Sequence, residues 1–383
     1  MPRLSPSIIT AAAILGLFAG CKSPAPVSPP APAAPPAPIK PPEPPPAVWE
    51  TENPVVPLPR PPLGVQADFG KLKVAVTPEK VRLGRWLFFD KRISVDGSVS
   101  CATCHRPESA FSEPTPHSTG VAGKVGGRKS PTFINGAWPL FDVYFWDGRA
   151  TSLSEQAKGP MANPIEMGGT HEGVAKAIAG VPGYRRIFRA VYGDDRVDID
   201  RIADAIAAYE ATRMSGNSRF DRFDAGDAAA LDEKEKLGRD LFHGKAECNQ
   251  CHLGWNLTDS QFHNLGIGWA GKPGKPGKAG KANKEGFADP GRAKVSNKDE
   301  DTGAFKTPTL REVTKHAPYM HDGSLATLRD VVQHYNKGGN PNPWLSPKIK
   351  KLKLSPAEID ALVAFMTALD GEGYQDTPPK SFP

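Results

Sequence analysis

The sequence contains little cysteine, five residues in 383, and few segments with the alternation that is typical of β-strands. Its charge is nearly balanced, with 48 Lys and Arg against 42 Asp and Glu, a formal net charge of +6. So small an excess gives no support to a nucleic-acid-binding role. The apolar run at residues 7–20 is too short to span a bilayer, so the sequence does not indicate a membrane-spanning protein.

Four of the five cysteines lie in two short motifs, CATCH at residues 101–105 and CNQCH at residues 248–252. C-x-x-C-H is the attachment motif of c-type haem, in which the thiols bind the haem vinyl groups and the histidine binds the iron. A C-x-x-C pair can also be half of a zinc site or a redox-active dithiol. Here no third C-x-x-C completes a four-cysteine zinc site, and each pair is followed directly by histidine. The sequence therefore predicts two covalently bound haem c groups. The predicted attachment residues are Cys101, Cys104, His105, Cys248, Cys251 and His252.

The fifth cysteine, Cys21, ends a predicted lipoprotein-type signal peptide at residues 1–21. The preceding Phe18-Ala19-Gly20 resembles a bacterial lipobox, in which the cysteine is lipidated and becomes the mature N-terminus. The alternative is a plain secretory signal with a leftover thiol. Both interpretations export the chain, and c-type haem is attached outside the cytoplasm. We therefore expect a periplasmic protein whose membrane contact is a lipid anchor on Cys21.

Residues 22–63 are mostly Pro and Ala, a composition that favours extended polyproline II and cannot form a core. We interpret this segment as a tether. The remaining chain is long enough for two domains, predicted at residues 64–225 and 226–383. The Lys-rich run at residues 271–278 is punctuated by Gly and Pro and is typical of a surface loop, with docking to an acidic partner as the alternative.

An internal repeat supports two similar units. LGRWLF at residues 83–88 precedes the first motif, and LGRDLF at residues 237–242 precedes the second. Apolar residues at helical spacing predict a helix over residues 200–213. Ser355-Pro356-Ala357-Glu358 is a capping box that leads into a second predicted helix. We predict a mainly α fold of two cytochrome c-like haem domains with long connecting loops.

Further stretches surround the two motifs in a fixed order. They are RKSPT at residues 128–132, FWDGRA at 145–150, QA at 156–157, NPIEM at 163–167, KTPTLR at 306–311 and APYMHDG at 317–323. Together they resemble the bacterial dihaem cytochrome c peroxidases and their MauG-like relatives, from about Val81 to Leu369. The resemblance implies that the haem on His105 is the peroxidatic site with an open distal face. It implies that the haem on His252 is six-coordinate and passes or stores electrons.

The resemblance also implies roles for four side chains. Glu166 matches the family's catalytic glutamate, which moves a proton between the two peroxide oxygens. Gln156 matches an amide that hydrogen-bonds in the same pocket, and Pro160 matches a proline that keeps space above the iron. Trp146 matches the aromatic residue between the two haems. Classical members take electrons from a small cytochrome or cupredoxin and suggest a homodimer.

This chain departs from the family pattern at the first haem. Classical members close the peroxidatic haem with a histidine at the position of Val121, and valine cannot bind iron. We therefore expect a permanently open site, with His117 as a substitute ligand if the loop shifts. At the position of an asparagine that binds calcium in the family stands Lys129, whose ammonium would repel a divalent cation, so calcium is doubtful.

The second haem also departs from the classical pattern. Classical members supply a methionine at the position of Tyr335, whereas MauG-like proteins have tyrosine there, as this chain does. A phenolate is expected to lower the reduction potential relative to a thioether. Met320 and His334 are the alternative ligands. The surface tryptophan that MauG presents before its second motif is absent, which argues against methylamine dehydrogenase maturation as the task.

Three functions remain open from the sequence. The first is an exported dihaem peroxidase that reduces hydrogen peroxide at the N-terminal haem with electrons relayed through the C-terminal haem. The second is a MauG-like oxidase that uses the oxidising equivalents on a partner protein. The third is a dihaem electron carrier without peroxide chemistry, in which Gln156 and Glu166 would have no purpose.

Overall fold

The computed structural model describes residues 47–138, 142–271 and 286–383. The predicted signal peptide, Cys21, residues 22–46 of the tether and residues 272–278 of the Lys-rich run lie outside these described residues. Residues 46–383 form one compact unit. No helix within the described residues is both long and apolar enough to cross a membrane.

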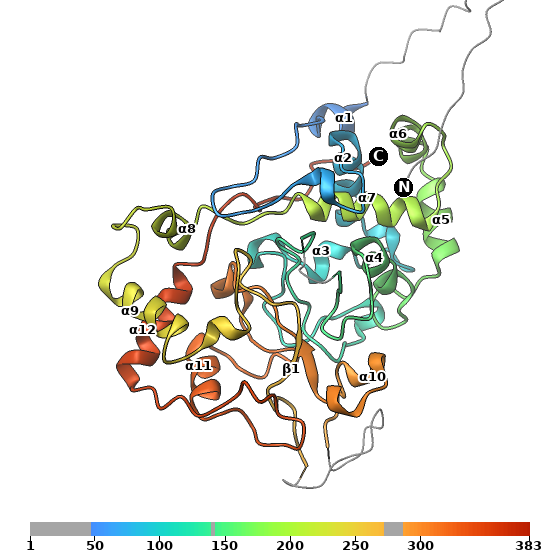
Figure 1. The fold of residues 1–383 in the computed structure, drawn as a ribbon. Coiled ribbons are helices and arrows are strands. Elements are labelled where there is room, and N and C mark those ends of the chain that lie inside the picture. The colour runs from blue at the N-terminus through green and yellow to red at the C-terminus, as the bar shows by residue number, and fades with distance from the viewer. Residues whose placement is uncertain (1–46, 139–141, 272–285) are drawn as a thin grey trace, which may run out of the picture. The chain divides into compact units, whose positions relative to one another are not determined.

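The described residues fold mainly into helices joined by long irregular segments, as predicted (Figure 1). The α-helices are α1 (Val48–Glu52), α2 (Pro78–Phe89), α3 (Cys101–Cys104), α4 (Leu153–Ala162), α5 (His171–Ala179), α6 (Pro182–Tyr192), α7 (Ile199–Ala211), α8 (Arg219–Asp224), α9 (Glu233–His243), α10 (Ala293–Ser296), α11 (Leu328–Asn336) and α12 (Pro356–Thr367). Two short strands, β1 (Phe262–Asn264) and β2 (Ala304–Lys306), pair antiparallel with His263 opposite Phe305. The predicted helices over 200–213 and after Ser355 are confirmed as α7 and α12.

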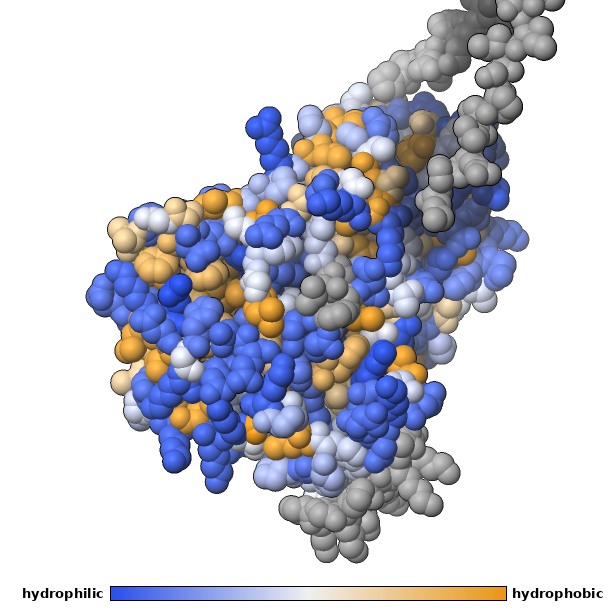
Figure 2. All heavy atoms as spheres, viewed as in Figure 1, coloured by the Kyte–Doolittle hydropathy of each residue, from blue (hydrophilic) through white to orange (hydrophobic). Residues whose placement is uncertain are grey.

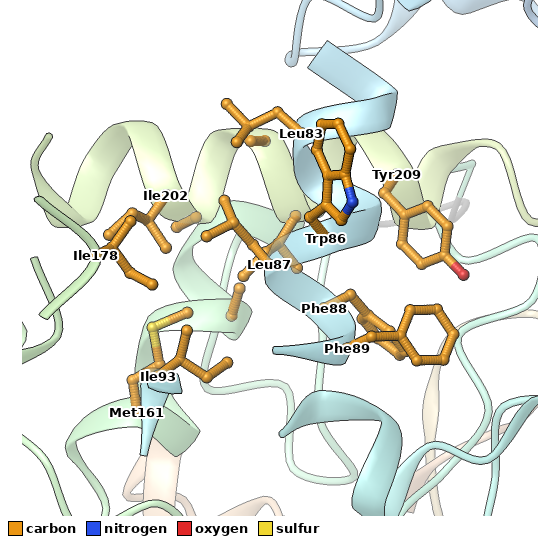
Figure 3. Close-up of a cluster of buried hydrophobic side chains, with 14 of the residues drawn as sticks. Leu83, Trp86, Leu87, Phe88, Phe89, Ile93, Met161, Ile178, Ile202 and Tyr209 are labelled. Atoms are coloured by element: carbon orange, nitrogen blue, oxygen red, sulfur yellow. The ribbon is translucent and has the colours of Figure 1, made fainter. Parts of the chain in front are cut away.

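Helix α2 begins with Thr77 as its N-cap and Pro78 in its first turn, and its apolar face packs on α7. Figure 3 shows the contact, with Leu83, Trp86 and Leu87 among the buried side chains. Gly84 lies at the crossing, where an added Cβ would stand 1.8 Å from the backbone oxygen of Ala205. Only glycine therefore permits this approach of the two helices.

The same arrangement recurs in the second half of the chain. Helix α9 begins with a capping box at Asp232 and packs on α12, which begins with the predicted capping box at Ser355. Gly238 lies at this crossing, and a Cβ there would stand 2.0 Å from the backbone oxygen of Ala361. The repeated LGR sequence thus corresponds to a repeated helix crossing, each followed by a C-x-x-C-H motif.

The two helix crossings belong to two hydrophobic clusters. The first gathers α2, α5, α6 and α7, and the second gathers α9, α11 and α12. A buried ion pair joins α8 to the segment after β2, because Arg311 binds both carboxylate oxygens of Asp221 at 2.6 and 2.8 Å. On the face shown in Figure 2, hydrophilic residues predominate and apolar residues are scattered among them.

Candidate functional site

The first C-x-x-C-H motif forms one helical turn that presents its histidine to the interior. Cys101 and Cys104 bound α3, and His105 follows as its C-cap. The Nδ1 atom of His105 lies 3.0 Å from the carbonyl oxygen of Phe111. A carbonyl oxygen can only accept, so Nδ1 carries the proton and Nε2 keeps its lone pair. Burial lowers the pKa of His105, which favours the neutral imidazole that a metal requires.

The second motif repeats this geometry. Cys248 begins a short 3-10 turn over Cys248–Gln250, and His252 follows. The Nδ1 atom of His252 lies 3.0 Å from the carbonyl oxygen of Leu257, and burial again lowers the histidine pKa. Leu257, like Phe111 after the first motif, has a positive φ, 51° against 56°. Both histidines are therefore held as neutral imidazoles of the same tautomer, the form that can bind a metal.

A cavity of about 980 Å³ adjoins the first motif. It brings together the predicted residues of the N-terminal site, which are Cys101, Cys104, His105, Trp146, Gln156, Pro160 and Glu166. Residues from the second half of the chain also line it, among them Asn256, Lys306 and Thr309. The cavity is large enough for a cofactor, and its walls come from both halves of the compact unit.

Helix α4 supplies two of these residues from one face. Gln156 and Pro160 are four residues apart, so they lie on the same side of the helix. Pro160 has no N–H, and the backbone carbonyl of Gln156 therefore lacks its usual helical partner. The helix ends at Ala162, where Asn163 N bonds to Pro160 O. The structure thus places an amide side chain and a helix break at the cavity wall.

Glu166 stands on the loop after α4. Its backbone N donates to Asn163 O at 3.1 Å, and its backbone oxygen accepts from Val121 N at 2.9 Å. Burial raises the pKa of the Glu166 carboxyl, and the charge of Arg149 opposes that shift. Arg149 belongs to the FWDGRA stretch, but the effect of its charge on Glu166 is visible only in the structure. A buried carboxyl at the cavity wall is a group that can transfer protons there.

Val121 is buried against the segment that carries Glu166. Val121 begins a short 3-10 turn over Val121–Gly123 and is 4% exposed. Its side chain lies so close to Gly168 that a Cβ added there would touch it. His117 is not among the residues that line the cavity, and its buried Nδ1 has no partner within the described residues.

Trp146 lies where the two halves of the chain meet. Its indole Nε1 donates to Lys129 O at 2.8 Å, and its backbone oxygen accepts from Lys306 N in β2 at 2.8 Å. The adjacent Asp147 binds Arg128, which also binds Asp289 from the second half. A hydrogen-bonded network therefore fixes the tryptophan at the junction.

Tyr335 lies in the last turn of α11, close to the second motif. Burial raises the pKa of its phenol, and the charges of Cys248 and Cys251 raise it further. The rival His334 has its Nε2 atom 3.0 Å from Leu265 O, so that nitrogen donates a hydrogen bond. The other rival, Met320, has a left-handed backbone with φ of 75°. The bond made by His334 Nε2 leaves that nitrogen engaged, which favours Tyr335 over His334.

Lys129 is buried, and its Nζ donates to the backbone oxygens of Glu113 and Thr115. Burial lowers the pKa of this ammonium to about 8. Sequence reasoning missed a further pair beside Cys251, in which His263 Nε2 lies 2.9 Å from Asp259. It also missed Glu210, a carboxyl in α7 that lines the cavity. A lone acid within the apolar stretch AAYEA was the available signal.

Two haem-attachment motifs with identically bonded histidines, one of them at a large cavity, define a c-type cytochrome with two haem sites. The chain belongs to the family of di-haem cytochrome c peroxidases, whose model matches residues 78–229. It is 39% identical to the methylamine utilization protein MauG of Methylorubrum extorquens, over 80% of this chain and 82% of that protein. It is 37% identical to the cytochrome c551 peroxidase of Nitrosomonas europaea, over 78% of this chain and 83% of that protein.

A solved structure of a MauG-like protein associated with microbial copper homeostasis superposes with a TM-score of 0.71. The identity is 30%, and the match covers 85% of this chain and 97% of that one. The predicted family is confirmed, and so is the class of activity, an oxidoreductase acting on peroxide. Membership also supports two haem c groups.

Proposed function

We propose that the protein reduces hydrogen peroxide to water at a haem on His105, with electrons relayed through a haem on His252. The observation that carries this proposal is the single cavity that joins the first attachment motif to Gln156 and Glu166. The residues present fit a haem, because the motif supplies two thiols and a neutral imidazole beside an adequate cavity. The iron supplies peroxide binding and the electrons that break the O–O bond.

Glu166 moves the proton that makes this cleavage possible. As a carboxylate it accepts a proton from the inner peroxide oxygen, and as an acid it returns that proton to the outer oxygen, which leaves as water. Burial raises the pKa of this carboxyl and so favours its protonated form, whereas the charge of Arg149 favours the carboxylate. Gln156, on the same wall, orients the peroxide by hydrogen bonding.

Pro160 and Trp146 complete this site. The ring of Pro160 offers no donor at the cavity, so water is held less firmly there. Trp146 provides an aromatic path for electrons, since it lines the cavity and bonds to β2 of the second half. Valine at position 121 leaves His105 as the one protein ligand of its haem, so the oxidised protein reacts directly with peroxide. His117 would be the substitute ligand only after a loop shift.

Tyr335 favours a second candidate function, MauG-like oxidation of a partner protein. Its phenol lies close to Cys248 and Cys251, which supports Tyr335 rather than Met320 or His334 as the distal ligand of the second haem. A phenolate lowers the reduction potential and favours storing an oxidising equivalent over accepting electrons from a small cytochrome or cupredoxin. The relative of Methylorubrum extorquens bears the name MauG.

We place the two haem domains at residues 64–225 and 226–383, and the chain in the periplasm with a lipid anchor on Cys21. Lys129 replaces a calcium ion, because its buried ammonium already bonds two backbone oxygens. A homodimer is the assembly that the classical family suggests.

One experiment separates the candidate functions. The oxidised, haem-loaded protein is mixed with peroxide, with and without a reduced small cytochrome, and the haem spectra are followed. Peroxide consumption coupled to donor oxidation supports the peroxidase. Rapid reaction without donor turnover supports the MauG-like oxidase. An inert protein contradicts both and leaves the electron carrier.

The role of Glu166 is tested in the same assay. Glu166→Gln removes the proton-transfer group and is expected to slow the reaction with peroxide by about 10²–10⁴-fold, with haem content unchanged. Glu155→Gln is the matched control, because Glu155 is an exposed carboxylate on α4 that bonds to Thr151. An equal loss in both variants, or none in Glu166→Gln, would remove Glu166 from the mechanism.

A further inference from the structure

A second carboxyl, that of Glu210, lines the same cavity as Glu166 but comes from α7. Glu210 lies near the end of α7, is 5% exposed, and is one of the residues that line the cavity. Its Oε2 atom is buried without a hydrogen-bond partner within the described residues. A buried polar atom without a partner costs free energy. Such a group in a cofactor cavity is therefore expected to serve the chemistry there.

The charged groups around Glu210 are engaged elsewhere. On α2, which packs on α7, Lys80 pairs with Asp204 and Arg85 with Asp376. On α4, Lys158 pairs with Asp200, and Arg213, beyond the end of α7, pairs with Asp376. Glu210 itself forms no ion pair with the described residues. Burial is the cause that raises its pKa, to about 8, so the carboxyl carries a proton at neutral pH.

Tyr144 lines the same cavity as Glu210 and is partly buried. It packs against the turn of α7 that contains Ala207 and Ala211, which flank Glu210 on the helix. Burial raises the pKa of the Tyr144 phenol, and the charges of Asp142 and Glu210 raise it further. Asp142 is half-exposed and pairs with Lys73. Glu210 and Tyr144 therefore share the cavity wall, and Asp142, two residues before Tyr144 in the chain, reaches solvent.

We propose that Glu210 is the proton store of the haem cavity, discharged into the cavity during peroxide reduction and refilled from solvent through the Tyr144 hydroxyl. Reduction of one peroxide to two waters breaks one O–O bond and consumes two electrons, from a one-electron donor protein, and two protons. Glu166 returns the proton that it takes, so it adds nothing to this count. Glu210 gives its O–H proton to the inner oxygen, which needs two protons to become the second water, and becomes a carboxylate; once refilled, it gives the second proton. Tyr144 then passes one proton inward as it accepts one from the side of Asp142.

This inference rests on the proposed function, but it makes a prediction that needs no peroxide. Reduction of a haem adds negative charge to the cavity and favours the protonated form of a nearby carboxyl. The reduction potential of the haem on His105 should therefore fall as pH rises around the pKa of Glu210. At the limit of one proton per electron, the equilibrium constant changes tenfold per pH unit, or about 59 mV.

The test is a spectroelectrochemical titration of the haem-loaded protein between about pH 6 and about pH 9.5, which brackets the raised pKa of Glu210. The wild type is expected to show the pH-dependent potential at the haem on His105, and Glu210→Gln is expected to lose it. Glu312→Gln is the matched control, because burial also raises the pKa of Glu312 while Ser215 and Gly371 bond to it outside the cavity. That variant should keep the pH dependence.

A pH-independent potential in the wild type, or an unchanged dependence in Glu210→Gln, would overturn the inference. If Glu210→Gln binds no haem, Glu210→Asp takes its place and should shift the pH at which the potential changes. In the wild type, an infrared difference spectrum between the two redox states should also contain the band of a protonated carboxyl. The wild type could be inert to peroxide while Glu210→Gln still loses the pH dependence of the reduction potential. That result would support the exchange of a proton between Glu210 and the haem cavity and reject the proposed function. A wild type that reduces peroxide, with an unchanged pH dependence of the potential in Glu210→Gln, would reject the proton store alone.

Discussion

Alanine at Gly84 is expected to test how closely α2 approaches α7. The substitution places a methyl group 1.8 Å from the backbone oxygen of Ala205, a distance that real Cβ atoms do not show. Neither helix can yield locally, because the added Cβ is fixed directly to the backbone of α2, the oxygen that it meets is backbone of α7, and the surrounding side chains are closely packed. The helices must therefore move apart by more than an ångström.

The magnitude follows from two opposing effects. Alanine has a higher helix propensity than glycine, which stabilises the fold by about 1 kcal/mol. Overpacking a well-packed interior costs about 1–3 kcal/mol, and a clash between two backbones falls at the upper end of that range. We expect Gly84→Ala to lower the free energy of unfolding by about 2 kcal/mol. Gly238→Ala should do the same, since its Cβ would stand 2.0 Å from Ala361 O.

The assay is urea unfolding of the haem-loaded protein, followed by far-UV circular dichroism together with the optical spectrum of each haem. Gly84→Ala should broaden the signature of the haem on His105 and leave the other unchanged, and Gly238→Ala should do the converse. Gly173→Ala in α5 is the control, because its nearest neighbour is the Thr170 hydroxyl at 3.1 Å. If Gly84→Ala were as stable as Gly173→Ala, the close crossing of α2 and α7 would be refuted.

Three further predictions concern the haem sites and the buried acid. Tyr335→Phe should turn the second haem high-spin and leave the first unchanged, as measured by optical and electron paramagnetic resonance spectra. An unchanged spectrum would assign the ligand elsewhere, and Met320→Leu would be the next variant to examine. Val121→His should supply a sixth ligand to the haem on His105 and slow the reaction of the oxidised protein with peroxide, measured by stopped flow; equal rates would contradict the open site. Glu210→Gln should change how stability depends on pH: the folded-state pKa of Glu210 is raised to about 8 from an ordinary value of 4.5. The unfolded chain thus loses this proton first, and the stabilising contribution, complete below about pH 4.5, is lost as pH rises through about 8. The free energy of unfolding of the wild type should therefore fall relative to that of Glu210→Gln as pH rises over that window. Parallel curves would show that the pKa of Glu210 is not raised in the folded protein.

Local sequence patterns predicted the helix-rich fold and two of its helices, α7 and α12, because such patterns act over a few residues. The helical spacing after Asp198 and the capping box at Ser355 each specify one helix through bonds made within a turn or two. The LGR repeat went further and indicated two equivalent units. The repeat did not reveal why Gly84 and Gly238 are glycines. The distance between two crossing helices depends on the partner helix, which lies more than a hundred residues away in the chain.

The candidate site divides in the same way. Cys101, His105 and Glu166 belong to short motifs that carry their own spacing, and the structure brings them to one cavity. Glu210 and Lys306 reach that cavity through tertiary packing, and no short pattern distinguishes a carboxyl in a cavity wall from one in solvent. The direction of its pKa shift is likewise a property of burial, which the sequence does not contain.

The two haem sites share a frame and differ in what lies around it. Each has a glycine-mediated helix crossing, a C-x-x-C-H turn and a histidine bonded to the carbonyl of a left-handed residue. These parts hold a haem and cannot by themselves decide its chemistry. The differences come from α4 and the loop after it, which bring Gln156 and Glu166 to the first site, and from α11, which brings Tyr335 to the second. Because these elements lie outside the repeated frame, substitutions in them should change reactivity at one haem without loss of haem attachment at either.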